Sequence, residues 1–397
     1  MSELRDAAIA ILSDLIGFPT VTGASNLELI AYCQDRLEQV GAEIQLTHDA
    51  DRQRANLLAR IGPPVAGGVV LSGHTDVVPA DPEGWTSPPY VATLRDGAIH
   101  GRGAVDMKGF IACVLAMAPR FAATNLARPV HIALTFDEEV GCVGAPLLIE
   151  QLLTGPLPAA AIVGEPTELA IVEAHKGCYE YTTEFVGTEG HASSPRLGVN
   201  AVEYAARFVT DLLELGEELR ERASADSPFE PPEATLSVGR VEGGSARNVI
   251  AGTCTVEWEF RPVTRDDAAF TLDRVRGIEA ALLEQMRAVH PAASIQTVTV
   301  GAVDGLERTP QDAATTLVQD LLDDPPRQVV PFGTEAGLYK QRGIPAVVCG
   351  PGSIAVAHQP DEHVTLGQLD RCLAMLDRLI EHLGDQPGRP QAHSPVA

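Results

Sequence analysis

The chain has 397 residues, more than one ordinary hydrophobic core accommodates, so two domains are expected. Its formal net charge of −25 argues against nucleic acid or an anionic membrane as a partner, because both attract basic surfaces. No stretch approaches the roughly 20 apolar residues of a membrane helix, and the N-terminus lacks the pattern of a secretory signal, so a cytoplasmic location is expected. The seven cysteines are scattered and form no Cys-x-x-Cys pair, which disfavours a disulfide framework and a thiolate zinc site.

The first part of the chain alternates helical and strand patterns. Apolar residues recur at helical spacing over residues 4–15 and 29–40, and the second of these segments ends at Gly41. Short apolar runs follow, namely "GVVLSGH", "VHIALTFDEE", "AAIVGEP" and, far downstream, "AVVCGPG". Continuous apolar strands separated by helices predict an α/β domain whose mainly parallel sheet is covered on both faces.

Residues 178–301 have a different pattern. The alternating stretch "YEYTTEFVG" is followed by a helical segment, two strand-like segments, a second helical segment and the strand-like "SIQTVTV". This βαββαβ order is typical of a small two-layer α+β domain. We therefore predict an insertion at 178–301 within a catalytic domain made of 1–177 and 302–384, and a disordered tail at 385–397 that is rich in Pro and polar residues.

Polar side chains gather where the predicted parallel strands end. In open α/β sheets, ligands bind at the carboxyl ends of the strands. Each such residue taken alone is more often a structural residue with satisfied hydrogen bonds, but several on one edge of a sheet indicate a site. The residues are His74, Asp76, Asp106, Asp137, Glu138, Glu139, Glu165 and His358.

The donor types at this edge favour a metal site. Imidazoles and carboxylates without thiolates suit Zn²⁺, Co²⁺ or Mn²⁺. Two imidazoles and three carboxylates exceed the ligands of one catalytic zinc and match two metals that share a bridging carboxylate. Asp76 lies two residues after His74, on the same side of an extended chain, where it could accept the far imidazole N–H.

Several motifs resemble those of a known family. They are "SGHTDVVP", "GRGAVDMKG", "TFDEEVGC", "VGEPT", "GHASSP" and "GTEAGLY…GIPAVVCGPGSIAVAHQPDE". They are similar to the dinuclear-zinc amidohydrolases and metallopeptidases that include acetylornithine deacetylases, succinyl-diaminopimelate desuccinylases, aminoacylases and carboxypeptidase G. The resemblance covers nearly the whole chain and is closest to the acetylornithine deacetylases.

The resemblance implies two Zn²⁺ per subunit, with Co²⁺ able to substitute, and a homodimer formed through the inserted domain. It implies His74 and Glu165 on one metal, Glu139 and His358 on the other, Asp106 as the bridge and a cis peptide bond between Asp106 and Met107. It also implies Glu138 as the general base and His191, across the dimer interface, as an oxyanion donor. Without the resemblance, His191 would equally suit an exposed turn.

For the substrate, the family points to Asn248 and Arg261 as carboxylate partners, although an Arg on such a strand more often faces solvent. The segment "NVIAG" lacks the Pro that many relatives have after the isoleucine, which leaves the local turn open. In "GTEAG", Thr334 and Glu335 are further candidates; Glu335 could pair with a δ-ammonium group or could be an ordinary turn acid. Lys176 in "AHKG" is also a candidate.

The expected reaction is hydrolysis of an N-acyl amide. The leading substrate hypothesis is N2-acetyl-L-ornithine, an intermediate of arginine biosynthesis. Asp76, Glu138 and His191 form the predicted catalytic set. Alternatives are deacylation of acetylcitrulline, succinyl-diaminopimelate or N-acyl amino acids in general. A non-catalytic metal-dependent binding protein is disfavoured, because a binder has no need of Glu138 as a base.

Overall fold

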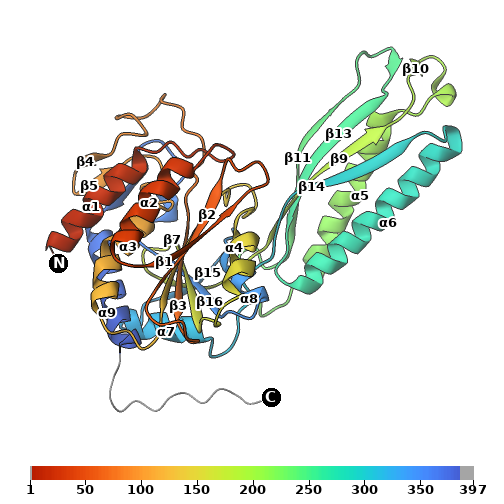
Figure 1. The fold of residues 1–397 in the computed structure, drawn as a ribbon. Helices are drawn as coiled ribbons and strands as arrows, with labels where there is room; N and C mark the ends of the chain where they lie inside the picture. The colour runs from red at the N-terminus through yellow and green to blue at the C-terminus, as the bar shows by residue number, and fades with distance from the viewer. Residues whose placement is uncertain (1, 385–397) are drawn as a thin grey trace.

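The computed structural model describes residues 2–384, so the predicted disordered tail at 385–397 lies outside the described residues. Figure 1 shows a large domain and an elongated inserted domain that extends away from it. Within residues 2–384, no helix combines the length and apolar character needed to cross a membrane.

The large domain is built on an eight-stranded sheet in the order β1-β2-β6-β3-β7-β16-β8-β15. Neighbours β6, β3, β7 and β16 pair in parallel, whereas β1, β2 and the single β8–β16 contact add antiparallel pairs. This confirms the predicted mainly parallel α/β sheet. The strands are β1 (Glu43–His48), β2 (Ala55–Ile61), β3 (Val69–His74), β6 (Val130–Thr135), β7 (Ala160–Pro166), β8 (Ile171–His175), β15 (Arg327–Val330) and β16 (Ala346–Gly350).

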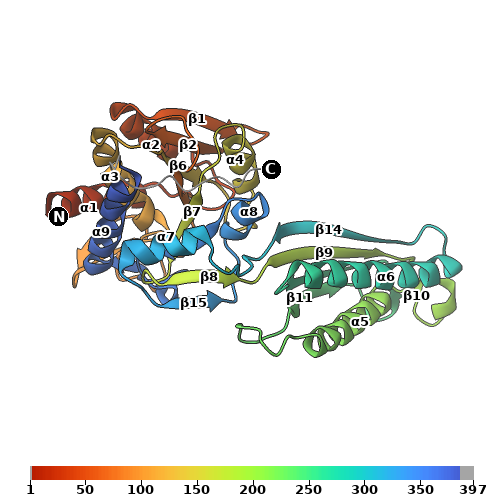
Figure 2. The ribbon, with the colours of Figure 1, turned by 90° about the horizontal axis from the view of Figure 1, so that it is seen from below.

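Helices cover both faces of this sheet (Figures 1 and 2). One core cluster joins the sheet to α1 (Ser2–Ile16), α2 (Leu27–Gln39), α3 (Lys108–Ala123), α7 (Ala313–Leu322) and α9 (Leu366–Leu383). Another joins the opposite face to α4 (Ala145–Leu152) and α8 (Ala336–Gln341).

Successive strand residues explain why the apolar runs are continuous. Leu57 and Ala59 of β2 belong to the first cluster, whereas Leu58 between them belongs to the second. Side chains alternate between the faces of a strand, so a strand covered on both sides needs apolar residues at every position.

A smaller three-stranded sheet lies beside the large one, in the order β17-β5-β4. Its strands are β4 (Thr93–Arg95), β5 (Ala98–His100) and β17 (His363–Thr365), and the short helix η2 (Ile354–Val356) precedes β17. Strand β17 pairs antiparallel with β5, which brings the segment after His358 next to the turn that leads to Asp106.

The inserted domain has a four-stranded antiparallel sheet in the order β11-β13-β9-β14. Its elements are β9 (Cys178–Val186), β10 (Gly190–His191), η1 (Pro195–Leu197), α5 (Ala201–Glu221), β11 (Thr235–Gly243), β12 (Val249–Ile250), β13 (Thr253–Arg261), α6 (Arg265–Val289) and β14 (Ser294–Val303). Both helices pack on one face of the sheet in a separate aromatic-rich core. The main elements follow the predicted βαββαβ order.

Local signals fix the ends of the two long inserted helices. The Asn200 side chain accepts hydrogen bonds from two N–H groups in the first turn of α5, and Thr264 and Asp267 form a reciprocal capping box at the start of α6. These caps satisfy backbone donors that the helix itself leaves free.

Candidate metal centre

The candidate ligands come from the carboxyl ends of the central strands and from two nearby loops. His74 is the last residue of β3, Glu139 follows β6, and Glu165 is near the end of β7. Asp106 lies in the turn before α3, and His358 follows η2. Because β3, β6 and β7 run parallel, their ends share one edge of the sheet, which brings His74, Glu139 and Glu165 together. The two loops add Asp106 and His358 at the same place.

The distances place Asp106 between the two imidazoles. His74 Nε2 lies 3.0 Å from Asp106 Oδ1, and His358 Nε2 lies 3.1 Å from Asp106 Oδ2. His74 Nε2 is also 3.5 Å from Glu165 Oε1, and His358 Nε2 is 3.1 Å from Glu139 Oε1. Each oxygen of Asp106 therefore faces a different histidine, with a further carboxylate beside each.

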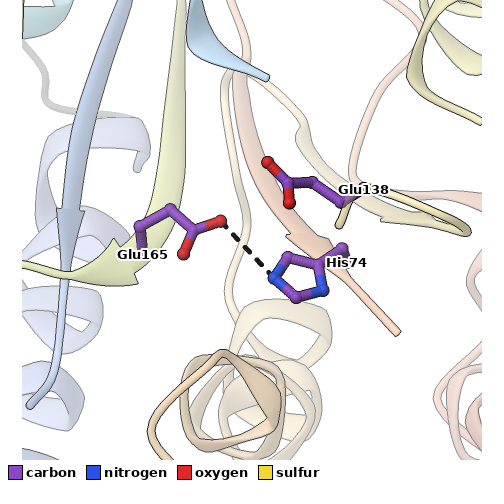
Figure 3. A group of neighbouring side chains, drawn as sticks. All are labelled: His74, Glu138 and Glu165. Carbon is purple, nitrogen blue, oxygen red and sulfur yellow. Dashed lines mark ion pairs between the residues drawn. The ribbon is translucent and has the colours of Figure 1, made fainter. Parts of the chain in front are cut away.

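The donor set fits divalent cations. Glu165 Oε1 is buried and has no hydrogen-bond partner, although a buried polar atom is normally satisfied. Figure 3 shows this carboxylate directed at His74, with the Glu138 carboxylate above the imidazole. Ligand atoms of His74, Glu138 and Glu165, and likewise of His74, Asp106 and Glu139, lie within 4.8 Å of one another.

The electrostatics of the site also fits bound divalent cations. Burial and neighbouring carboxylates raise the pKa of Glu138 and of Glu165 well above the usual value for a glutamate. Cations at this place would offset the repulsion between these acids and stabilise the ionised forms that ligate metals.

Asp76 has a wider role than the sequence indicated. His74 Nδ1 lies 2.9 Å from the Asp76 backbone oxygen and 3.5 Å from its Oδ1, so main chain and carboxylate both face the imidazole. The Asp76 carboxylate also accepts the backbone N–H groups of Glu138, at 3.0 Å, and Glu139, at 3.3 Å. It therefore fixes the backbone of the acidic turn as well as the histidine.

Asp137, the first acid of "TFDEEVG", stabilises the turn. Asp137 has a φ of 51°, accepts the Gly23 N–H at 2.8 Å and forms an ion pair with Arg54. Its carboxylate is therefore bound to protein groups and is not grouped with the candidate metal ligands.

Two further buried groups, Cys142 and Glu335, lie near the candidate site. Cys142 Sγ is 3.5 Å from Glu138 Oε1, a contact that the sequence reasoning missed, although the thiol follows the acids in the same motif. Glu335, 1% exposed, accepts hydrogen bonds from Ser72 Oγ at 3.1 Å and Thr135 Oγ1 at 2.5 Å. Both carboxylate oxygens of Glu335 are therefore bonded to residues of the strands that end in the site, β3 and β6.

The predicted oxyanion donor and the other predicted substrate residues do not gather around these candidate ligands. His191 and Asn248 lie by the β10–β12 pair at the far tip of the inserted domain (Figure 1), where the Ala192 N–H donates to the Asn248 backbone oxygen. Within one chain they are remote from the large sheet. Arg261 ends β13 at the base of the inserted domain and forms a two-pronged ion pair with Glu259, at 3.0 and 3.1 Å.

Lys176 and Thr334 are engaged elsewhere. The buried Lys176 ammonium donates to the backbone oxygens of Pro231 and Glu233 at 2.8 and 2.7 Å, so the structure gives it a role in fixing the junction between the domains. Thr334 Oγ1 is 3.1 Å from His175 Nε2 and accepts the N–H at the start of α8. The Asp106–Met107 peptide bond is cis, as the resemblance implied.

A model of peptidase family M20/M25/M40 matches residues 70–382, most of the chain. The chain belongs to this family. An acetylornithine deacetylase of Myxococcus xanthus is 37% identical over 96% of this chain and 99% of that relative. The protein is therefore a metallohydrolase of the M20 family, which supports metal-dependent hydrolysis of N-acyl amino acids.

Solved structures share the fold. An M20 metallo-carboxypeptidase of Sulfolobus solfataricus aligns with a TM-score of 0.75 at 18% identity, over 94% of this chain and 98% of that one. A dinuclear metal-binding M20 peptidase of Bacillus subtilis aligns with a TM-score of 0.66 at 15% identity, over 96% and 99%. At these identities the likeness shows a shared fold, which includes the inserted domain because the alignments cover nearly the whole chain.

Proposed function

We propose that this protein hydrolyses N2-acetyl-L-ornithine to L-ornithine and acetate, a step of arginine biosynthesis, as a cytoplasmic homodimer. The observation that carries the proposal is the Asp106 carboxylate between two imidazoles, each beside a further carboxylate, with Glu138 next to them. The substrate is suggested by the name of the Myxococcus xanthus relative.

Two Zn²⁺ ions, or Co²⁺ in their place, are the proposed cofactors. His74 and Glu165 would hold one, Glu139 and His358 the other, and Asp106 both. When bound, such a pair supplies an activated water and polarises the acyl oxygen.

Glu138 is the proposed general base and acid. It takes the proton of the attacking water and delivers it to the leaving amine. Burial and nearby acids raise the pKa of its carboxyl group, which favours proton uptake. The Asp76 carboxylate accepts the Glu138 backbone N–H, so Asp76 contacts both the proposed base and His74.

The inserted domain is proposed to complete the site from the other subunit. His191 is exposed and lies far from its own chain's metal ligands (Figure 1), which suits a residue that acts across a dimer interface. Asn248 lies beside it at the same tip and is the proposed partner of the substrate carboxylate, with Arg261 at the base of the domain as a second candidate.

A broader deacylase of N-acyl amino acids is the alternative. The burial of Glu335 and its bonds to Ser72 and Thr135 favour it, because a carboxylate engaged in these bonds is less free to select a δ-ammonium group. The site would then discriminate weakly between side chains.

The test is an assay of amine release by the purified protein with Zn²⁺ or Co²⁺. The panel contains N2-acetylornithine, acetylcitrulline, acetylmethionine and succinyl-diaminopimelate. A clear preference in kcat/KM for acetylornithine supports the proposal, similar values across the panel support the broader deacylase, and a preference for another member rejects acetylornithine as the substrate.

A further inference from the structure

Two loops that carry candidate metal ligands meet at one buried side chain, that of Glu362. Its Oε1 accepts the backbone N–H of Val105 at 3.0 Å and that of Asp106 at 3.2 Å. Its Oε2 accepts from Arg102 Nη1 at 2.6 Å, and its backbone oxygen accepts the Gly101 N–H at 2.9 Å. The turn that ends in Asp106 is thus bound to Glu362 by side chain and main chain.

This contact is buried, and Arg102 has further partners. Glu362 and Arg102 are 1% and 3% exposed, so their charges have little water around them and depend on one another. Arg102 also donates to the Pro79 backbone oxygen at 3.4 Å, and its guanidinium lies over the Trp85 ring at 5.3 Å. Few other positions are open to the Glu362 carboxylate.

Glu362 and Asp76 contact different candidate ligands. Asp76 contacts His74 and the backbone of Glu139, whereas Glu362 binds the backbone of Asp106. Glu362 also lies four residues after His358, at the start of the segment that pairs with β5. It therefore connects the Asp106 turn to the His358 loop.

We infer that Glu362 is a positioning residue of the metal centre, which sets the Asp106 carboxylate against the His358 imidazole. The inference rests on the proposed two-metal function. Since Asp106 directs one oxygen toward each imidazole, at 3.0 and 3.1 Å, a shift of its backbone disturbs both metal positions at once. Partners of ligating groups commonly account for about 10–100-fold in metal affinity.

Asp312 offers a matched control elsewhere in the same domain. It too is a buried carboxylate that accepts two backbone N–H groups, from Ala314 at 3.0 Å and Thr315 at 3.4 Å, and one cation, Lys340 Nζ at 2.7 Å. It caps α7 and contacts none of the candidate ligands. Asp312→Asn therefore makes the same carboxylate-to-amide change at a similarly bonded buried position, away from the metal centre.

The experiment titrates metal-free protein with Co²⁺, followed by calorimetry and by the visible absorption of bound Co²⁺. Glu362→Gln should bind Co²⁺ about 10–100-fold more weakly at both positions, with the circular dichroism of the wild type. Asp312→Asn should bind as the wild type does. Glu362→Asp keeps the charge opposite Arg102 but is one methylene too short to reach all three donors, so it should also bind more weakly.

Wild-type affinity and spectrum in both Glu362 variants would overturn the inference. A defect in Glu362→Gln alone would mean that only the negative charge opposite Arg102 matters, which rejects positioning. An equal defect in Asp312→Asn would mean general destabilisation, which also rejects it. If Glu362→Gln does not fold, Glu362→Asp decides alone. Wild-type protein that binds no Co²⁺ would instead refute the proposed two-metal function, and this inference with it.

Discussion

Glu138 and Glu139 are neighbours in the chain, yet their carboxylates have different partners. Glu139 Oε1 lies 3.1 Å from the His358 imidazole, whereas Glu138 Oε1 lies 3.5 Å from the Cys142 thiol. Both lie in a turn, in which the Glu138 backbone oxygen accepts the N–H groups of Gly141 and Cys142, and the Asp76 carboxylate fixes the backbone N–H groups of both glutamates. One pair of acids can therefore serve two separate tasks.

Substitutions of these two glutamates should have separable effects. Glu139→Ala should reduce metal content, because it removes a proposed ligand. Glu138→Gln should retain the metals and lose at least about 10²-fold in turnover, since it removes the proposed base. Metal analysis and kcat measured on the same preparations check this, and the reverse pattern would show that the two roles are exchanged.

His191→Ala should leave metal content intact and lower turnover about 10²–10³-fold, the usual cost of removing an oxyanion donor. A mixing experiment tests whether His191 acts across the dimer. The impaired His191→Ala and Glu138→Gln proteins, unfolded and refolded together, should regain activity. One site of each mixed dimer would combine an intact Glu138 with an intact His191. No recovery from mixed dimers of demonstrated composition would place His191 in its own subunit.

Glu335 can be tested through selectivity. If its carboxylate recognises the δ-ammonium group, Glu335→Gln should raise KM for acetylornithine more than for acetylmethionine. If it only stabilises the site through its bonds to Ser72 and Thr135, turnover of both substrates should fall alike, mainly through kcat. The ratio of the two KM changes is the measurement.

His131 should make stability depend on pH independently of the metals. Burial and the neighbouring Arg60 guanidinium lower the pKa of this histidine to about 4, against about 6.5 in an unfolded chain. The folded state therefore favours the neutral ring. Its contribution is complete above about pH 6.5 and is lost as the pH falls toward about 4, by up to about 3 kcal/mol.

Urea unfolding in the presence of a chelator measures this effect. The wild type should lose more stability than His131→Gln between about pH 7 and about pH 4.5, because the variant cannot take up that proton. Parallel pH profiles for the two proteins would contradict the assignment.

Much of the fold and of the candidate site can be predicted from the sequence because the signals are local. Continuous apolar runs mark strands buried on both faces, and the residue after such a run lies at the carboxyl end of its strand. His74, Glu139 and Glu165 follow from that rule alone. Asp106 and His358 were added by their place in polar segments next to apolar elements, and the inserted domain by its βαββαβ order. The family resemblance added the expected role of each residue.

The tertiary structure decided what each buried polar group contacts. Glu362 meets Asp106 and Arg102 across 256 and 260 residues of chain, and Lys176 meets two carbonyl oxygens across 55 and 57. Periodicity reports which face of an element is buried, but it says nothing about which donor or acceptor packs against it. By itself, the sequence determined which residues stand at the edge of the sheet. Packing between distant segments decided that Glu335 is bonded to Ser72 and Thr135, that Glu362 binds the Asp106 turn, and that His191 lies far from the candidate metal centre of its own chain. Such partners are set by how the elements fold together.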